Sequence, residues 1–401
     1  MIPRLIEIKD LDSAQAEMRA IGVDGPGIEL MAPKAVFRIV KIKGVQPVAA
    51  NIIKQEILAL GGEAATTRGA INHSVKASDV LLFGTLKQLY KLARKLKASY
   101  FGLPAIAQQI EDAIANHERR SSKFKIGRRT LEIGLRTYIM GILNVTPDSF
   151  SDGNEYFKPE NALERAERLI DEGADMIDIG GESTRPGAKT VTAGEEIKRI
   201  IPVIKQLARK KRAIISVDTR KAIVAAAAIK AGAQMVNDVS GLRFDNKMAK
   251  VIADHGVAVC IMHSRGNPAN MQKNPLYSDL LGEVIDFLAG GLAIARKADI
   301  LHGKILVDPG IGFGKTVEHN LEILRRLNEL KVLGCPILVG PSRKSFIGKV
   351  LDLPVGERVE GTAAAVALAI ANGADMVRVH DVKEIKRVVQ LTDAIVRTRE
   401  K

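Results

Sequence analysis

The chain has 401 residues, 46% of them hydrophobic and 26% charged, which is the composition of an ordinary globular protein long enough for two or three domains. Its formal net charge is +14, and residues 1–135 carry 21 Lys and Arg against 13 Asp and Glu. No aromatic platform is interleaved with these basic residues, so we interpret the charge as solubilising and expect no nucleic acid partner. The two cysteines, Cys260 and Cys335, lie in apolar runs without zinc or disulfide spacing, and no segment has the pattern of a signal peptide or a membrane span. We therefore expect a cytoplasmic protein with buried, reduced thiols and no membrane partner.

Residues 1–130 predict a small α/β domain. The first 30 residues are interrupted by Gly and Pro, and only residues 12–20 have a helical pattern. The expected elements are a strand over 35–43, a helix over 47–60, a strand over 80–83, and helices over 86–96 and 104–115. The region has no paired carboxylates, Cys/His cluster or Gly-rich phosphate loop, so we expect an accessory domain of unknown role. The polar, basic run 117–130 places the domain boundary near residue 130.

Residues 131–401 predict a TIM (β/α)8 barrel. Apolar strands alternate with helical patterns from residue 138 to the end, at 138–143, 176–179, 213–217, 235–237, 257–262, 305–307, 336–339 and 376–379. Strands that are apolar on both faces are typical of a buried parallel sheet, and eight of them match the strand number of this barrel. A doubly wound open sheet is the alternative.

The clearest candidate site begins at Asp308, which ends an apolar strand and is followed by Pro309 and then by glycines at 310, 312 and 314. A carboxylate at the end of a buried strand indicates a partner in a cleft, because an unpaired buried charge is costly. A turn in which Asp308 only caps the next helix is the structural alternative. The end of this stretch looks like a phosphate-binding P-loop, but that motif needs Gly at position 309, where this chain has Pro.

The same order, an apolar strand and then a polar group, recurs at every strand end. The residues are Asn144, Asp178, Asp218, Asn237 with Asp238, Met262 with His263, Asp308, Ser342 to Lys344, and Arg378 with His380. Because the carboxyl ends of barrel strands open on one face, we expect these side chains to converge there.

The converging groups divide into two chemical classes. Asp218, Asn237 and Asp308 offer carboxylate and amide edges, which suit a planar heterocycle with adjacent N–H donors, such as a pterin. The donors suit a diphosphate, with Asn144 as an oxygen ligand for Mg2+; they are Thr184, Arg185, Lys344, Arg378 and His380. In the structural alternative, Asp178 or Asp238 pairs with Arg185 or Arg378 to hold loops, and His380 is a buried, satisfied histidine.

Six blocks of the chain resemble the signature blocks of dihydropteroate synthase and occur in the family's order. They are Met140–Gly153, Gly180–Gly187, Ser216–Thr219, Asp308–Lys315, Ser342–Ser345 and Arg378–Asp381. The resemblance implies a transferase of folate biosynthesis, a target of sulfonamides, that condenses 6-hydroxymethyl-7,8-dihydropterin diphosphate with 4-aminobenzoate and releases diphosphate. It also implies a homodimer formed through barrel helices.

The resemblance also gives individual residues their roles. The pterin would be held by Asp218, Asn237, Asp308 and Lys344, and Met262 would be a further substrate-binding residue. Mg2+ and diphosphate would be met by Asn144, Thr184, Arg378 and His380. The aminobenzoate slot would be bordered by Pro186, Phe313, Ser342 and Lys344, with Thr184, Arg185 and Pro186 on a mobile loop. The residues expected to act in the reaction are Asp218, Lys344, Arg378 and His380, and the implied mechanism is dissociative.

Two other functions are compatible with parts of the sequence. A methyltransferase that moves a methyl group from a methyltetrahydrofolate to a corrinoid protein would use similar Asp and Asn contacts, but has no use for diphosphate-binding residues. Alternatively, an inactive barrel would leave the basic first domain to bind nucleic acid or a partner. Two features depart from the family: Pro341 would stiffen the turn before Ser342, and residues 1–135 have no counterpart in the minimal enzyme.

Overall fold

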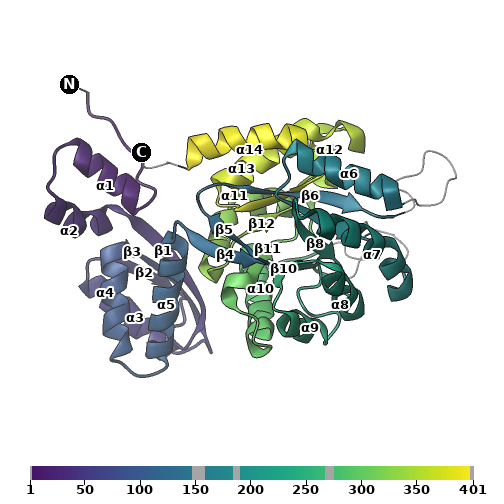
Figure 1. The fold of residues 1–401 in the computed structure, drawn as a ribbon. Helices are drawn as coiled ribbons and strands as arrows, with labels where there is room; N and C mark the ends of the chain where they lie inside the picture. Colours follow the sequence, from purple (N-terminus) through teal and green to yellow (C-terminus); the bar gives the residue numbers. More distant parts are fainter. Residues whose placement is uncertain (1, 147–158, 184–189, 267–274, 398–401) are drawn as a thin grey trace. The chain divides into compact units, whose positions relative to one another are not determined.

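The computed structural model describes residues 2–146, 159–183, 190–266 and 275–397, and the chain divides into two compact units, Met1–Arg119 and Arg120–Lys401 (Figure 1). The division falls before the expected boundary near residue 130. The reason is a hairpin, formed by β4 (Ser122–Ile126) and β5 (Arg129–Ile133), that packs in the core of the second unit. No helix in these described ranges is long and apolar enough to cross a membrane.

The first unit is an antiparallel sheet with helices, in the strand order β1-β3-β2. Its elements are α1 (Leu11–Ala20), α2 (Gly25–Ala35), β1 (Phe37–Val45), α3 (Pro47–Ala59), β2 (Glu63–Thr66), β3 (Ser78–Thr85), α4 (Leu86–Lys97) and α5 (Leu103–Glu118). The apolar faces of α3 and α4 pack with β3 in one core, through Ile53, Ile57, Leu82, Leu89 and Leu92. The five elements expected over residues 35–115 are present, with bounds shifted by a few residues.

Two elements of this unit are absent from the sequence-based expectation. Helix α2 begins with Gly25, Pro26 and Gly27, which together resemble a turn. The helix forms because a side-chain oxygen of Asp24 accepts the N–H of Gly27 at 3.0 Å, and because proline fits a first turn that needs no N–H donor. Strand β2 is only four residues long, too short for a clear alternation.

Parallel strands close into a barrel in the second unit. They are β6 (Tyr138–Asn144), β7 (Met176–Gly180), β8 (Ile214–Asp218), β9 (Met235–Asp238), β10 (Ala258–Met262), β11 (Ile305–Asp308), β12 (Leu338–Val339) and β13 (Met376–Val379). Their order is β11-β10-β9-β8-β7-β6-β13-β12, and a parallel bridge between Val307 and Ile337 joins the two ends. This closure confirms the barrel and excludes the open doubly wound sheet.

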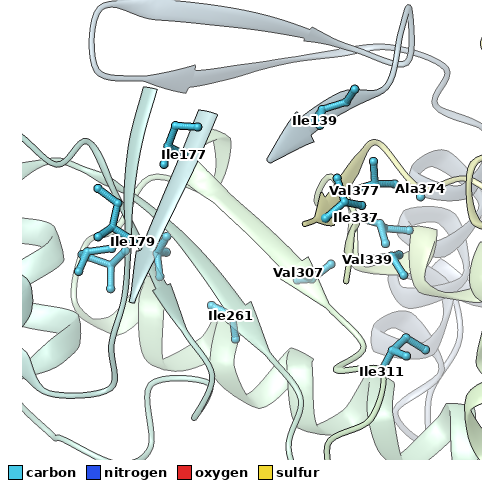
Figure 2. Close-up of a cluster of buried hydrophobic side chains, with 14 of the residues drawn as sticks. Ile139, Ile177, Ile179, Ile261, Val307, Ile311, Ile337, Val339, Ala374 and Val377 are labelled. Atoms are coloured by element: carbon cyan, nitrogen blue, oxygen red, sulfur yellow. The ribbon is translucent and has the colours of Figure 1, made fainter. Parts of the chain in front are cut away.

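Helices cover the outside of the barrel (Figure 1). They are α6 (Pro159–Glu172), α7 (Ala193–Lys210), α8 (Ala222–Ala231), α9 (Met248–His255), α10 (Leu280–Lys297), α11 (Val317–Arg325), α12 (Ser345–Leu351), α13 (Val359–Ala371) and α14 (Val382–Val396). Outward-facing strand residues such as Ile177, Ile179 and Val377 pack with these helices in the main core (Figure 2). Residues two apart in a strand share a face, so the residues between them line the barrel interior.

The hairpin β4–β5 closes one end of that interior. Phe124, Ile126, Leu131 and Ile133 form one buried cluster with the first inward residues of the strands, which include Tyr138, Met176, Ile214 and Met376. Cys260 lies in the same cluster, and both cysteines are buried and outside any disulfide in the described residues, as expected. The barrel therefore has an apolar floor.

Candidate active site

The barrel interior changes from apolar to polar one layer above this floor. In β7 the inward residue Met176 is followed two positions later by Asp178, in β9 Met235 by Asn237, and in β13 Met376 by Arg378. Because strand residues two apart point to the same side, the polar side chains stack directly over the apolar ones. The strands thus carry charged and amide groups toward their carboxyl ends, at the mouth of the barrel.

Arg378 links two carboxylates across this layer. Its Nε donates to Oδ2 of Asp178 at 2.6 Å, and its Nη2 donates to Oδ2 of Asp218 at 2.8 Å. Burial lowers the pKa of Arg378, but the two carboxylates outweigh burial and raise it. Burial also raises the pKa of Asp218 to about 7, with Arg378 opposing and Asp178 reinforcing the shift. The layer is held by a buried network of ion pairs, which is costly to break.

Several oxygens of this layer have no hydrogen-bond partner in the described part of the chain. Nδ2 of Asn237 donates to Oδ2 of Asp178 at 2.9 Å, yet Oδ1 of both residues is buried and unpartnered. Ser216, which precedes Asp218 by two residues on β8, has an unpartnered Oγ as well. Buried acceptors without donors are rare, and here they face the interior of the barrel, so a ligand with N–H groups would satisfy them.

Asp308 is held by the glycine-rich turn that follows it. Its Oδ1 accepts the N–H of Gly310 at 2.6 Å. Burial raises the pKa of Asp308 to about 6, against the opposing effects of this hydrogen bond and of Lys344. Gly310 has a φ of +67°, and a Cβ added there would lie 1.9 Å from the carbonyl oxygen of His263, so the turn requires glycine.

A small apolar cluster lies beside Asp308, whose register partner across β10 and β11 is Met262. Met262 and Phe313 form a small buried cluster with Val239 packed against it. The Nζ atom of Lys344 lies 4.3 Å from the centroid of the Phe313 ring, within the range of a cation–π contact. Burial, with Arg378, lowers the pKa of Lys344 to about 8.

Ser342 and His380, which follow the neighbouring strands β12 and β13, are joined by hydrogen bonds. Oγ of Ser342 lies 3.0 Å from Nδ1 of His380 and accepts the backbone N–H of the same residue at 3.2 Å. Burial lowers the pKa of His380 to about 3, with Arg378 contributing, so the imidazole is neutral. Arg343, which follows Ser342, forms an ion pair with Asp381 and so helps to hold the turn after β12.

A cavity of about 290 Å3 opens beside Asp218 and Phe313. Thr219, Val239 and Ser240 also line it. This volume is close to the lower end of small-molecule sites, which begin at about 300 Å3.

The structure brings together most of the residues predicted for the site. Asp218, Asn237, Met262, Asp308, Phe313, Ser342, Lys344, Arg378 and His380 are all at the carboxyl ends of the strands or in the turns that follow them. Asn144 ends β6 at the same side, half-buried. Thr184, Arg185 and Pro186 lie outside the described residues.

Asp178 and Asp238, the two carboxylates for which the sequence also allowed a structural role, have different positions. Asp238 caps the turn after β9, where its Oδ1 accepts the N–H of Ser240 at 2.8 Å and its Oδ2 accepts the N–H of Leu242 at 3.0 Å. It thus holds a loop, as in the structural alternative, but through backbone N–H groups and not through Arg378. Asp178 pairs with Arg378, also as that alternative holds, but it does so within the site. The site thus includes Asp178, and its place two residues after Met176 is the signal that could have identified it.

The family model described as pterin binding enzyme matches residues 140–380, which include the closed barrel, its buried unpartnered acceptors and the apolar cluster of Met262 and Phe313, so the chain is a pterin-binding enzyme. The chain belongs to the dihydropteroate synthase family. It is 50% identical over 271 residues to dihydropteroate synthase of Synechocystis sp., which covers 67% of this chain and 94% of that protein. The solved structure of Xanthomonas albilineans dihydropteroate synthase with 4-aminobenzoic acid is 42% identical, with a TM-score of 0.65, over 70% of this chain and 100% of that one.

The first unit also has a counterpart in a relative. A probable bifunctional folylpolyglutamate synthase/dihydropteroate synthase of Haloferax volcanii is 40% identical over 386 residues, which is 94% of this chain and 45% of that protein. Both relatives are named as synthases, so the methyltransferase alternative is not favoured.

Proposed function

We propose that the barrel condenses 6-hydroxymethyl-7,8-dihydropterin diphosphate with 4-aminobenzoate to give 7,8-dihydropteroate and diphosphate. The observation that carries this proposal is the set of unpartnered acceptors on Asp178 and Asn237, deep in a barrel of the dihydropteroate synthase family. The 2-amino and ring N–H groups of a pterin are donors of the kind these oxygens need. The family relative from Xanthomonas albilineans, solved with 4-aminobenzoic acid, supports the second substrate.

The charges of the site suit a dissociative reaction. The C–O bond to the diphosphate breaks first and leaves a pterin cation, to which the amine of 4-aminobenzoate then adds with loss of a proton. Asp218 and Asp308, both buried, would stabilise the cation, while Lys344 and Arg378 would stabilise the departing diphosphate. With Nδ1 accepting the Oγ–H of Ser342, neutral His380 would carry its proton on Nε2 and donate a hydrogen bond from there.

We also propose that Mg2+ accompanies the diphosphate and is held at Asn144. The described residues contain no group of three or more His, Cys, Asp or Glu side chains that could cage a metal. This donor set fits Mg2+, which usually keeps its waters and takes one or two protein ligands together with substrate phosphates. When bound, Mg2+ would supply positive charge to the leaving diphosphate.

A homodimer through the barrel helices is the partner we propose. Helices α13 and α14 expose large apolar side chains, with Leu368 42% exposed, Leu391 65% and Ile395 72%. Large apolar side chains gathered on a surface favour a protein interface. Light scattering tests the dimer, and the mass of a single chain would refute it.

The reaction is tested by following dihydropteroate by chromatography and diphosphate by a coupled assay, with purified protein, Mg2+ and both substrates. Product that requires both substrates supports the proposal, and Asp218→Asn serves as a folded variant expected to be inactive. Bound pterin without product would refute it and would revive the methyltransferase alternative, which transfer of a methyl group from methyltetrahydrofolate to a corrinoid acceptor would then test.

A further inference from the structure

A buried lysine lies behind the glycine-rich turn and has no part in the proposed reaction. Lys315 is 2% exposed. Its Nζ lies 2.8 Å from Nδ1 of His263, 2.9 Å from the carbonyl oxygen of Gly310 and 3.0 Å from that of Phe313. An ammonium group has three hydrogens and cannot accept, so these acceptors satisfy it completely. A buried lysine whose donors are all used inside the protein indicates a fixed role in the structure of the turn.

The imidazole of His263 is suited to accept from this ammonium. Burial and Lys315 together lower the pKa of His263 to about 2, so the ring is neutral, with its proton on Nε2 and a lone pair on Nδ1. The ring packs edge-on against Phe287 with centroids 4.8 Å apart, and the backbone N–H of His263 donates to the carbonyl oxygen of Asp308 at 2.9 Å. His263 is therefore fixed both to the barrel wall and to the strand that carries Asp308.

The two carbonyls belong to the turn that carries the substrate-facing groups. Gly310 donates its N–H to the carboxylate of Asp308 and its carbonyl accepts from Lys315, so this one residue, through its two flanking peptide groups, joins the two side chains. The carbonyl of Phe313 also accepts a hydrogen bond from Lys315, and the ring of Phe313 makes the cation–π contact with Lys344. The Lys315 ammonium therefore holds the turn at two points, the carbonyls of Gly310 and Phe313.

We propose that Lys315 and His263 are positioning residues for pterin binding: their contact holds the turn so that Asp308 and Phe313 face the substrate, and it places a positive charge behind Asp308. The proposal rests on the proposed function, since it names the pterin as the ligand of Asp308. Neither residue touches the substrate, so both act through the turn.

The positive charge has a defined effect on Asp308. The groups that face this carboxyl are Lys344 in the turn after β12, Lys315 at the end of its own turn, Arg378 on β13, and the Cys260 thiol on β10. The three cations favour the ionised carboxylate, against burial, which raises its pKa to about 6. Burial lowers the pKa of Lys315 to about 7, with Asp308 opposing and Lys344 reinforcing the shift, so the ammonium is present at the lower pH where Asp308 titrates. Removal of Lys315 therefore moves the titration of Asp308 to higher pH.

The test measures the affinity of the full chain for 6-hydroxymethyl-7,8-dihydropterin, which lacks the diphosphate, by calorimetry across the pH range. For the wild type we expect affinity to fall as the pH drops through about 6, where Asp308 takes up a proton. In Lys315→Met, loss of one neighbouring cation should raise this midpoint by about one pH unit or more. If the midpoint reaches about 7.5, the ionised fraction near pH 6.5 falls from about three quarters to about one tenth, and the apparent affinity falls about eightfold.

Two variants at position 263 form a matched pair. His263→Asn keeps an acceptor near the place of Nδ1, so its pH midpoint should stay within about half a unit of the wild type. His263→Leu has similar bulk without the acceptor, and its midpoint should move in the same direction as that of Lys315→Met. Both variants retain Lys315, so they test whether its contact with His263 controls the titration of Asp308 even if Lys315→Met does not fold.

The outcomes are separable from the proposed function. A wild type that does not bind the pterin refutes the function itself. A uniform loss of affinity at every pH, with an unchanged midpoint in Lys315→Met, would show a purely structural residue and overturn the positioning proposal. Equal midpoints in the Asn and Leu variants at 263 would overturn the role of the imidazole.

Discussion

Asp308→Asn is the most direct test of the carboxylate that we assign to the pterin. In the structure Oδ1 of Asp308 accepts the N–H of Gly310 at 2.6 Å. The oxygen of the introduced amide would stay at this position, because only an acceptor satisfies that N–H. Its NH2 group would then occupy the place of Oδ2 and meet the N–H donors of the pterin. The substitution therefore replaces an attraction by a repulsion, although the shape of the side chain is retained.

The expected loss follows from the strength of a hydrogen bond to a charged group, about 1.5–3 kcal/mol. This range corresponds to a dissociation constant raised about 10-fold to 150-fold. Calorimetry with 6-hydroxymethyl-7,8-dihydropterin at about pH 8 would measure it, a pH at which wild-type Asp308, whose pKa is raised to about 6, is ionised.

The matched control is Asp238→Asn. Asp238 is also buried at a strand end, but its oxygens are used by the turn that follows β9. Its substitution should leave pterin affinity within about threefold of the wild type, with any cost appearing in thermal stability. An Asp308→Asn protein that binds the pterin within about twofold of the wild type would remove Asp308 from the pterin site and refute the reasoning.

Three further predictions concern the network, the metal and the first unit. Arg378→Met leaves Asp178 and Asp218 without their cation, which should cost about 3–5 kcal/mol of folding stability. The pKa of Asp218 is already raised to about 7. The folding stability that comes from a buried carboxyl with a raised pKa is lost as the pH rises through that value. The calorimetric transition should therefore fall further at about pH 8 than at about pH 5, and equal decreases would contradict the assignment. Chelation of Mg2+, or Asn144→Ala at limiting Mg2+, should abolish diphosphate release while pterin affinity is retained; release that is insensitive to chelator would refute the metal proposal. A chain that begins at Arg120 should fold and turn over substrate, since that unit has its own core, and a folded but inactive product would show that residues 1–119 complete the site.

The barrel could be predicted from the sequence because each of its strands is a distinct apolar run. The observed strands differ from the expected ones chiefly at their carboxyl ends, where β8 and β11 include Asp218 and Asp308 as their last residues. Convergence of the polar groups also followed from the sequence, since parallel strands of a barrel end on one face. Strand periodicity alone separates Asn237, which faces the interior, from its neighbour Asp238, which caps a turn.

Contacts between distant segments could not be predicted in this way. Lys315 and His263 are separated by 52 positions, and their contact depends on the path of a glycine turn that no pattern specifies. The pairing of Arg378 with both Asp178 and Asp218 is of the same kind: the sequence offers several carboxylates and cations, and only the closed barrel selects the partners. Helix α2 was missed for a local reason, because its cap and its proline stand among glycines that otherwise favour a turn.

The hairpin β4–β5 makes the barrel interior a blind pocket. With Phe124 and Leu131 packed into the floor, the hairpin blocks the amino end of the barrel, and in the described residues the polar layer lies toward the carboxyl ends of the strands. A ring bound at Asp178 and Asn237 lies nearer the floor than anything bound at the turns around Phe313 and Ser342. The deeper ligand must therefore bind first, because a molecule bound at the outer turns would block the path into and out of the deeper site. Under the proposed function this geometry imposes an ordered addition, with the pterin binding first and the arylamine second, and its signature is an arylamine that binds only when the pterin site is filled.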